Sequence, residues 1–283
     1  MYEKYLLQLE EAGKIRNLKE SSVESYKNYV SYFLNHMNKV PEELTCQDVR
    51  DFILFKKSLG LKPSTLNLYN AAIRFFFKYV LHKLWDDMTV PRMLNDHKIP
   101  VILTPDEINT ILDATKSLKY KAIFATMYSS GLRVSEVVHL HYDDISRSKM
   151  QIHVRKPKNR MDRYTILSER NLALLTEYWF QYGRPRDILF PSRQTGQYLT
   201  PASVRRTLTA SVAAAGIRAN VTPHSLRHSF ATHLMEQGVD QRTIQALLGH
   251  RDPRSTEIYL HVSNKSLMGV RSPFDAWAGG SNE

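Results

Sequence analysis

Four side chains in the last quarter of the chain are of types that handle phosphate esters. His224 and Arg227 lie three residues apart in P-H-S-L-R-H, His250 follows in L-L-G-H, and Tyr259 follows in S-T-E-I-Y-L-H. An arginine is always charged and its planar fork matches phosphate oxygens, while a histidine can donate to them or move a proton. A tyrosine supplies a phenol oxygen that can act as a nucleophile. Together they would suit metal-free cleavage of a phosphodiester.

Each of these residues also has an ordinary explanation. A histidine and an arginine on one helix usually form a solvated face, and one tyrosine among fifteen is usually a packing residue. His224 and His228 have the spacing of a zinc pair, but H-S-L-R-H lacks the glutamate of the zinc motif H-E-x-x-H. We therefore expect no metal site. The chemical interpretation rests on the ordered set and not on a single member.

A second candidate motif is G-L-R-V-S-E, which contains Arg133 and Glu136. The flanking residues are largely apolar, and arginine is rarely buried without a partner. Glu136 lies three residues on and could form an ordinary surface ion pair with Arg133. The alternative is that Glu136 orients Arg133 toward a phosphate.

A third motif, Q-I-H-V-R-K-P-K-N-R-M-D-R-Y-T-I-L, predicts a hairpin with a cationic loop. Ile152 and Val154 alternate with polar residues, as do Tyr164 and Ile166, so two short strands are expected on either side of the loop. A lysine in the loop could reach a scissile phosphate and protonate a leaving 5′ oxygen. A basic hairpin more often contacts only backbone phosphates.

The helix that carries the first pair is predicted by local signals. Thr222 is expected at the N-cap, Pro223 at the first helical position, and Gly238 at the carboxyl-terminal stop. His224 and Arg227 then share one face of the first turn. Free N–H groups and the helix dipole already favour an anion there.

Helical periodicity divides the rest of the chain into two parts. Apolar stripes predict helices over 23–37, 45–60 and 66–80, and a short helix near 2–12 completes a bundle. Periodicity fails from Asp86 to Ile102, so we expect a helical domain over 1–88, a linker over 89–102 and a second domain over 103–283. Capping boxes are expected at Thr45 with Asp48 and at Thr104 with Glu107.

Composition favours a polyanionic partner. The chain has 39 Lys+Arg against 28 Asp+Glu, a net charge of +11. The excess is 14 − 12 = +2 over residues 1–97 and 25 − 16 = +9 over residues 98–283, so it accompanies the candidate chemistry. One cysteine, Cys46, excludes an intrachain disulfide, and no long apolar run or secretion signal is present. We expect a soluble cytoplasmic protein that does not enter a membrane.

In their order and spacing these motifs resemble those of the tyrosine recombinase (phage-integrase) family. The matching segments are G-L-R-V-S-E, the hairpin lysine, H-S-L-R-H, L-L-G-H and I-Y-L-H, and D-I-L-F-P-S at 187–192 is also similar. The compact bacterial Xer and integron types are the most similar. The family's hairpins commonly contain G-K-G-x-K-x-R, and aligning D-R-Y-T-I-L places the catalytic lysine at Lys158, with Lys156 as the competitor.

The resemblance implies a fold and a reaction. The fold is mainly α: an amino-terminal helical (SAM-like) core-binding domain and a mostly helical catalytic domain with a small antiparallel sheet. The reaction is site-specific DNA recombination without a cofactor, through a 3′-phosphotyrosine on Tyr259. Arg133, Arg227 and His250 would stabilise the transition state, with His224 assisting proton movement. A type IB topoisomerase-like enzyme and a non-catalytic DNA-binding accessory protein are the alternatives.

The resemblance also implies that both domains surround double-stranded DNA and that a homo-tetramer is the working unit. Residues expected on the DNA backbone are basic: Lys56, Lys57, Lys62, Arg74 and Lys78 in the bundle, and Lys156 and Arg160 in the hairpin. The apolar tail after Tyr259, with Leu267, Met268, Val270, Phe274 and Trp277, is expected to dock on a neighbouring protomer. Packing on its own domain is the alternative.

Overall fold

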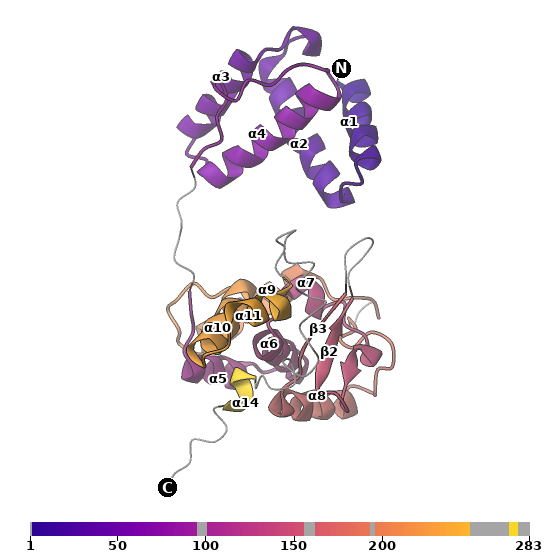
Figure 1. Ribbon diagram of the computed structural model, residues 1–283, viewed down its shortest axis with the longest axis vertical. Helices are drawn as coiled ribbons and strands as arrows, with labels where there is room; N and C mark the ends of the chain where they lie inside the picture. Colours follow the sequence, from indigo (N-terminus) through magenta and orange to yellow (C-terminus); the bar gives the residue numbers. More distant parts are fainter. Residues whose placement is uncertain (1, 95–100, 156–161, 193–195, 250–271, 277–283) are drawn as a thin grey trace. The chain divides into compact units, whose positions relative to one another are not determined.

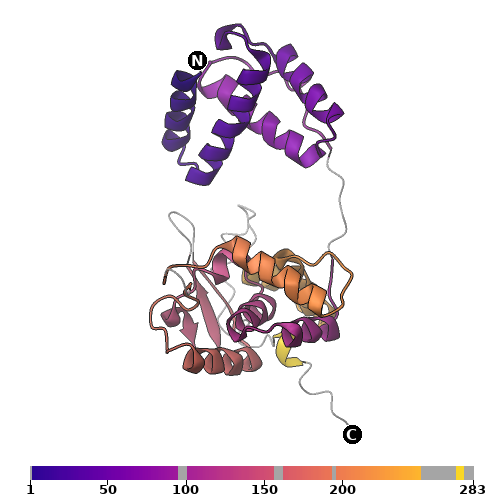
Figure 2. The same ribbon diagram turned by 180° about the vertical axis from the view of Figure 1, so that it is seen from behind.

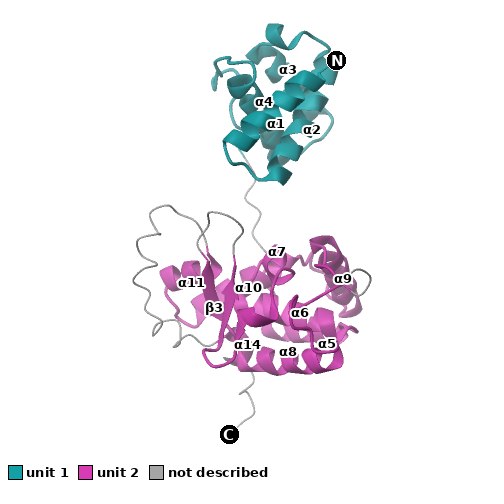
Figure 3. Ribbon diagram, turned by 90° about the vertical axis from the view of Figure 1, so that its right-hand side faces the viewer, with its two compact units in different colours: residues 1–98 teal, residues 99–283 magenta. Residues whose placement is uncertain are grey.

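The computed structural model describes residues 2–94, 101–155, 162–192, 196–249 and 272–276. The chain forms two compact units, residues 1–98 and 99–283, coloured separately in Figure 3. The boundary between the units lies inside the linker that the sequence predicts at 89–102. No helix among the described residues is long and apolar enough to cross a membrane.

The described part of the first unit is a helical bundle. Its elements are α1 (Glu3–Ile15), α2 (Glu20–Met37), the 3₁₀ turn η1 (Pro41–Glu43), α3 (Cys46–Ser58) and α4 (Pro63–Tyr79). Helices form where the apolar stripes predict them, and the first one runs to Ile15 instead of ending near 12. The stripes meet in one core whose largest fully buried members are Phe33, Phe52, Phe76 and Phe77. At the start of α3, Thr45 and Asp48 form the predicted capping box.

The second unit is mainly helical with a small sheet. Its described helices are α5 (Pro105–Ala114), α6 (Leu118–Ser130), α7 (Val134–Val137), α8 (Glu169–Gln181), α9 (Pro201–Ala214), α10 (Pro223–Glu236), α11 (Gln241–Leu248) and α14 (Pro273–Ala276). The strands are β1 (Ile145–Ser146), β2 (Gln151–Val154) and β3 (Arg163–Ile166), antiparallel in the order β1-β2-β3, and η2 (Tyr142–Asp144) precedes β1. The predicted capping box of Thr104 and Glu107 begins α5.

Helix α6 is the central element of this unit, as Figures 1 and 2 show. Every residue from Ala122 to Ser130 is buried, so α6 has no solvated face after its first turn. The helix ends at Gly131, whose φ of +63° is in the region that favours glycine. A Cβ there would lie 2.5 Å from Phe230 Cδ1 on α10, so only glycine allows this close packing. The chain therefore leaves the core within two residues and arrives at Arg133.

Strands β2 and β3 are the two strands that the sequence predicts on either side of the cationic segment. In β3, Tyr164 is 50% exposed, whereas Arg163 and Thr165 are buried. The register pairs Val154 with Arg163, which puts both side chains on the inner face of the sheet. The burial of Arg163 is possible because hydrogen bonds described below satisfy its guanidinium.

The described part of the carboxyl-terminal tail, residues 272–276, packs on its own domain. Phe274 is 2% exposed, contacts the ring of Tyr128 edge-on, and lies under the guanidinium of Arg170. The Asp275 carboxylate accepts hydrogen bonds from two backbone N–H groups at the start of α8. Phe274 therefore follows the alternative that the sequence left open, in which the tail packs on its own domain. The other apolar tail residues named above lie outside the described residues.

The docking of Phe274 predicts a stability effect that is independent of protein concentration. Phe274→Ala should lower the free energy of unfolding of the second unit by about 3–5 kcal/mol, because it empties a buried aromatic site. Urea denaturation at two protein concentrations measures this change. Phe180→Ala, at a side chain that is 55% exposed, is the control and should have little effect. An effect that appears only at high protein concentration would instead place Phe274 on a neighbouring molecule.

Candidate active site

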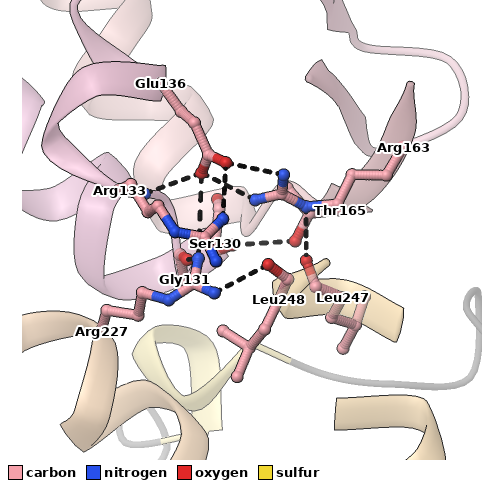
Figure 4. Close-up of polar contacts among 9 residues, drawn as sticks. All are labelled: Ser130, Gly131, Arg133, Glu136, Arg163, Thr165, Arg227, Leu247 and Leu248. Carbon is pink, nitrogen blue, oxygen red and sulfur yellow. Dashed lines mark hydrogen bonds and ion pairs between the residues drawn. The ribbon is translucent and has the colours of Figure 1, made fainter. Parts of the chain in front are cut away.

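The carboxylate of Glu136 is the centre of a cluster of arginines (Figure 4). It accepts the backbone N–H of Arg133 at 2.8 Å and the Arg133 Nη1 at 2.9 Å. Arg163 reaches the same carboxylate from β3 with both terminal nitrogens, each at 2.8 Å. The side chain of Glu136 is only 12% exposed. Glu136 is therefore no ordinary surface partner of Arg133, because it fixes two arginines from different elements.

Arg227 joins the cluster from the first turns of α10 and is held by main-chain carbonyls. Its Nη1 donates to Gly131 O and its Nη2 donates to Leu248 O, both at 2.7 Å. Its Nη1 lies 3.8 Å from Glu136 Oε2. The side chain is 5% exposed, so its orientation is fixed by the ends of α6 and α11.

The cluster has an excess of positive charge. Arg133, Arg163 and Arg227 surround one carboxylate, which leaves a formal charge of +2. Burial by itself would raise the pKa of Glu136, but the hydrogen bonds and charges of Arg163 and Arg133 lower it to about 2. Burial and the charge of Arg133 lower the pKa of Arg227 to about 9, so Arg227 stays protonated at neutral pH. Such a site favours an anion.

His224 lies at the start of α10, where the sequence predicts it. The helix begins at Pro223, and the Thr222 backbone N–H donates to the Ser225 hydroxyl at 3.1 Å. Desolvation lowers the pKa of His224, and the charges of His228, Arg227 and Arg133 lower it further. The imidazole is therefore neutral at neutral pH and can accept a proton. Within the described ranges, no three His, Cys, Asp or Glu side chains lie close enough together to hold a metal ion. His224 and His228 therefore have no third metal ligand among these residues.

Arg163 is the member of the cluster that the sequence prediction missed. Besides binding Glu136, its Nε donates to Leu247 O at 2.9 Å. A Cβ on Gly249, which has a φ of +62°, would lie 2.8 Å from Arg163 Cδ. The register of the hairpin could have indicated that Arg163 is buried, because Arg163 pairs with Val154 across the two strands and therefore faces the same side of the sheet as that buried valine. Arg163 therefore links β3, α7 and the end of α11.

The remaining predicted site residues lie outside the described residues: Lys156, Lys158, Arg160, His250 and Tyr259. In the first unit, Arg74 forms a bidentate ion pair with Asp87 at 2.7 and 3.1 Å, which offsets its charge. Lys56 lies over several aromatic rings, among them Phe52 and Tyr69. Lys57, Lys62 and Lys78 are exposed. Their contact with DNA stays a prediction.

The low pKa of Glu136 predicts how stability depends on pH. Its folded value of about 2 lies below the reference value of 4.5, so the ion pairs stabilise the fold fully above pH 4.5. This contribution, ~3 kcal/mol at most, is lost as the pH falls toward 2. Glu136→Gln should therefore lower the unfolding free energy at pH 7 and progressively less below pH 4.5. Urea titrations across this range test it, with the exposed Glu177→Gln as the control; a pH-independent difference would contradict the assignment.

Comparisons with known proteins agree with this geometry. Residues 102–266 match the phage integrase family, and residues 5–87 match the phage integrase N-terminal SAM-like domain. A putative integrase/recombinase, y4qK, of Sinorhizobium fredii is 37% identical over 269 residues, which cover 94% of this chain and 87% of that protein. The tyrosine recombinase XerD of Listeria innocua is 30% identical, with 92% and 94% covered.

Solved structures share the fold. The XerH site-specific recombinase, in a post-cleavage complex with its palindromic difH substrate, aligns with a TM-score of 0.68 at 23% identity, covering 90% of this chain and 80% of that one. A lambda integrase (75–356) dimer bound to a COC′ core site aligns with a TM-score of 0.71 at 18% identity, covering 90% and 94%. By the two family matches and the sequence relatives, the chain belongs to the phage integrase family of tyrosine recombinases.

Proposed function

We propose that the protein is a site-specific DNA recombinase that breaks and rejoins strands with Tyr259 as its nucleophile. The observation that carries the proposal is the arginine cluster on Glu136, which holds excess positive charge in a fixed arrangement. A phosphodiester that is being substituted gathers charge on its non-bridging oxygens, and preorganised donors stabilise that charge. Family membership supports the same reaction.

In the proposed reaction, the Tyr259 phenol oxygen attacks the scissile phosphorus. A P–O bond to tyrosine forms, the P–O bond to the 5′ oxygen breaks, and the products are a 3′-phosphotyrosine and a free 5′-hydroxyl. The phosphodiester bond energy is conserved in the protein–DNA link, so another 5′-hydroxyl can reverse the step without ATP or another cofactor. Attack by a 5′-hydroxyl of a different strand gives integration, excision or resolution.

The phenol needs a base, because a tyrosine with a reference pKa of about 10 is mostly protonated at neutral pH. His224 suits this role since its pKa is lowered and its imidazole is neutral. Arg133, Arg227 and His250 bind the non-bridging oxygens, and Glu136 orients Arg133. Lys158 in the hairpin loop protonates the leaving 5′ oxygen, with Lys156 as the alternative.

The proposed partner is double-stranded DNA with specific recombination sites, in the cytoplasm. The +11 net charge and its concentration in the second unit support a polyanionic partner. The proposed working unit is a homo-tetramer on DNA. A lambda integrase tetramer bound to a Holliday junction, which shares the fold at 17% identity and a TM-score of 0.70, illustrates such an assembly. Because Phe274 packs on its own domain, we assign any tail contact between protomers to residues outside 272–276.

Substitution of the nucleophile separates binding from chemistry. Tyr259→Phe removes only the phenol oxygen, so DNA binding should persist while the covalent protein–DNA adduct disappears. Arg227→Ala should bind DNA but cleave at least about a hundredfold more slowly, since it loses a preorganised transition-state donor. Gel-shift binding and adduct trapping on a nicked site measure the two properties. A covalent adduct formed by Tyr259→Phe would disprove the assignment of the nucleophile.

The lysine alternatives can be distinguished by the leaving group. A 5′-bridging phosphorothiolate substrate releases a thiolate that needs no proton, so it should restore cleavage by Lys158→Ala and not by Arg133→Ala. Lys156→Ala should cleave ordinary DNA normally. If instead Lys156→Ala were the defective variant that this substrate rescues, the general acid would be Lys156.

A further inference from the structure

The hairpin that carries the proposed general acid has two faces with different tasks. On the inner face, Val154 and Arg163 form a cross-strand pair, and Arg163 binds Glu136 in the arginine cluster. On the outer face, His153 and Tyr164 form the next pair, and their rings stack with centroids 4.9 Å apart. The inner face therefore belongs to the site already described. The outer face carries a network that the proposed mechanism does not use.

The network starts at Asp144, a buried carboxylate at the base of the sheet. Its side chain is 1% exposed, and its Oδ2 accepts the backbone N–H of His141 at 2.8 Å. Asp144 ends the turn η2 and is followed directly by β1, whose first residue Ile145 pairs with Ile152 of β2. Backbone pairing and burial thus fix the position of this carboxylate relative to the sheet.

Both residues that flank segment 156–161 belong to the network around Asp144. Arg155, the last residue before the loop, donates from Nε to Asp144 Oδ1 at 2.6 Å. Asp162, the first residue after it, accepts from His153 Nε2 at 3.0 Å. The other ring nitrogen of His153 lies 3.5 Å from Asp144 Oδ1. The residue before the segment is therefore hydrogen-bonded directly to the buried carboxylate, and the residue after it is hydrogen-bonded to an imidazole that lies beside the same carboxylate.

The chemistry of these contacts suits a rigid connection. The bond between Arg155 and Asp144 is charge-assisted and short, and Asp144 raises the pKa of Arg155. A buried carboxylate that loses a hydrogen-bond donor is destabilised, so displacement of Arg155 from Asp144 costs free energy. The His153 ring is hydrogen-bonded to Asp162 and stacks on Tyr164, which restricts its rotation, and its second nitrogen lies beside Asp144.

We propose that Asp144, His153, Arg155 and Asp162 form a hairpin clamp that positions the general-acid lysine of the loop for proton transfer to the 5′ oxygen. These are positioning residues, since they act through the lysine. The proposal rests on the proposed function. It assigns a role in one step of the reaction, because a general acid must lie within hydrogen-bond reach of its oxygen, whereas phosphate binding by the arginine cluster does not need the outer face.

The test compares two substrates with two clamp variants. Arg155→Ala and Asp162→Ala each release one end of the loop, and both side chains are about half exposed, so the fold should tolerate the changes. The control is Arg147→Ala in the turn between β1 and β2, which removes the same charge as Arg155→Ala but contacts Thr176 on α8. Single-turnover cleavage is measured on ordinary DNA and on the 5′-bridging phosphorothiolate, and thermal unfolding monitors the fold.

The clamp variants should cleave ordinary DNA about tenfold to a hundredfold more slowly, the range expected for a misplaced reacting group, while Arg147→Ala cleaves normally. On the phosphorothiolate they should recover nearly the wild-type rate, because no proton is needed. Two outcomes overturn the clamp proposal alone. In the first, the clamp variants cleave ordinary DNA normally. In the second, the phosphorothiolate restores cleavage by Lys158→Ala or Lys156→Ala but not by the clamp variants. If neither lysine variant is relieved, the lysine assignment fails, and the clamp proposal fails with it.

Discussion

The burial of the Glu136 carboxylate among guanidinium groups is the constraint on which the catalytic domain depends. One carboxylate satisfies Arg133 and Arg163 and lies within 3.8 Å of Arg227, so α7, β3 and α10 must converge on it. Removing a charge from water costs several kcal/mol unless its partners are well placed. The relative positions of α7, β3 and α10 are therefore strictly constrained, because a displacement of any of them would leave a buried charge without its partner. In the proposed reaction, the same strictness would give the scissile phosphate a set of donors that need no rearrangement.

Backbone features of the second unit serve this convergence. Helix α6 is buried on all sides after its first turn and leads to Gly131, whose positive φ and missing Cβ let the chain turn against Phe230. The turn presents Arg133 to Glu136 and the Gly131 carbonyl to Arg227. A hydrophobic core and an arginine cluster thus share one short segment of chain, where packing determines the geometry of the polar groups.

The sequence predicts what local chemistry determines. The caps at Thr45, Thr104 and Thr222 and the stop at Gly238 depend on a few neighbouring residues, and the helices begin and end close to them. Arg163 was missed because its partners lie 27 residues away on α7 and 84 residues away on α11. A short strand shows its orientation only through its register, which is set by tertiary contacts.

The carbonyls of Leu247 and Leu248 at the end of α11 have a consequence for the dynamics of the enzyme. They accept the bonds from Arg163 and Arg227, so two of the three cluster arginines are oriented by the last turn of one eight-residue helix. A short helix opens by local unfolding more readily than a domain unfolds globally. Each such opening would remove these two acceptors and so disorganise the arginine cluster. Amide hydrogen exchange along α11 then reports the fraction of molecules that are competent to react.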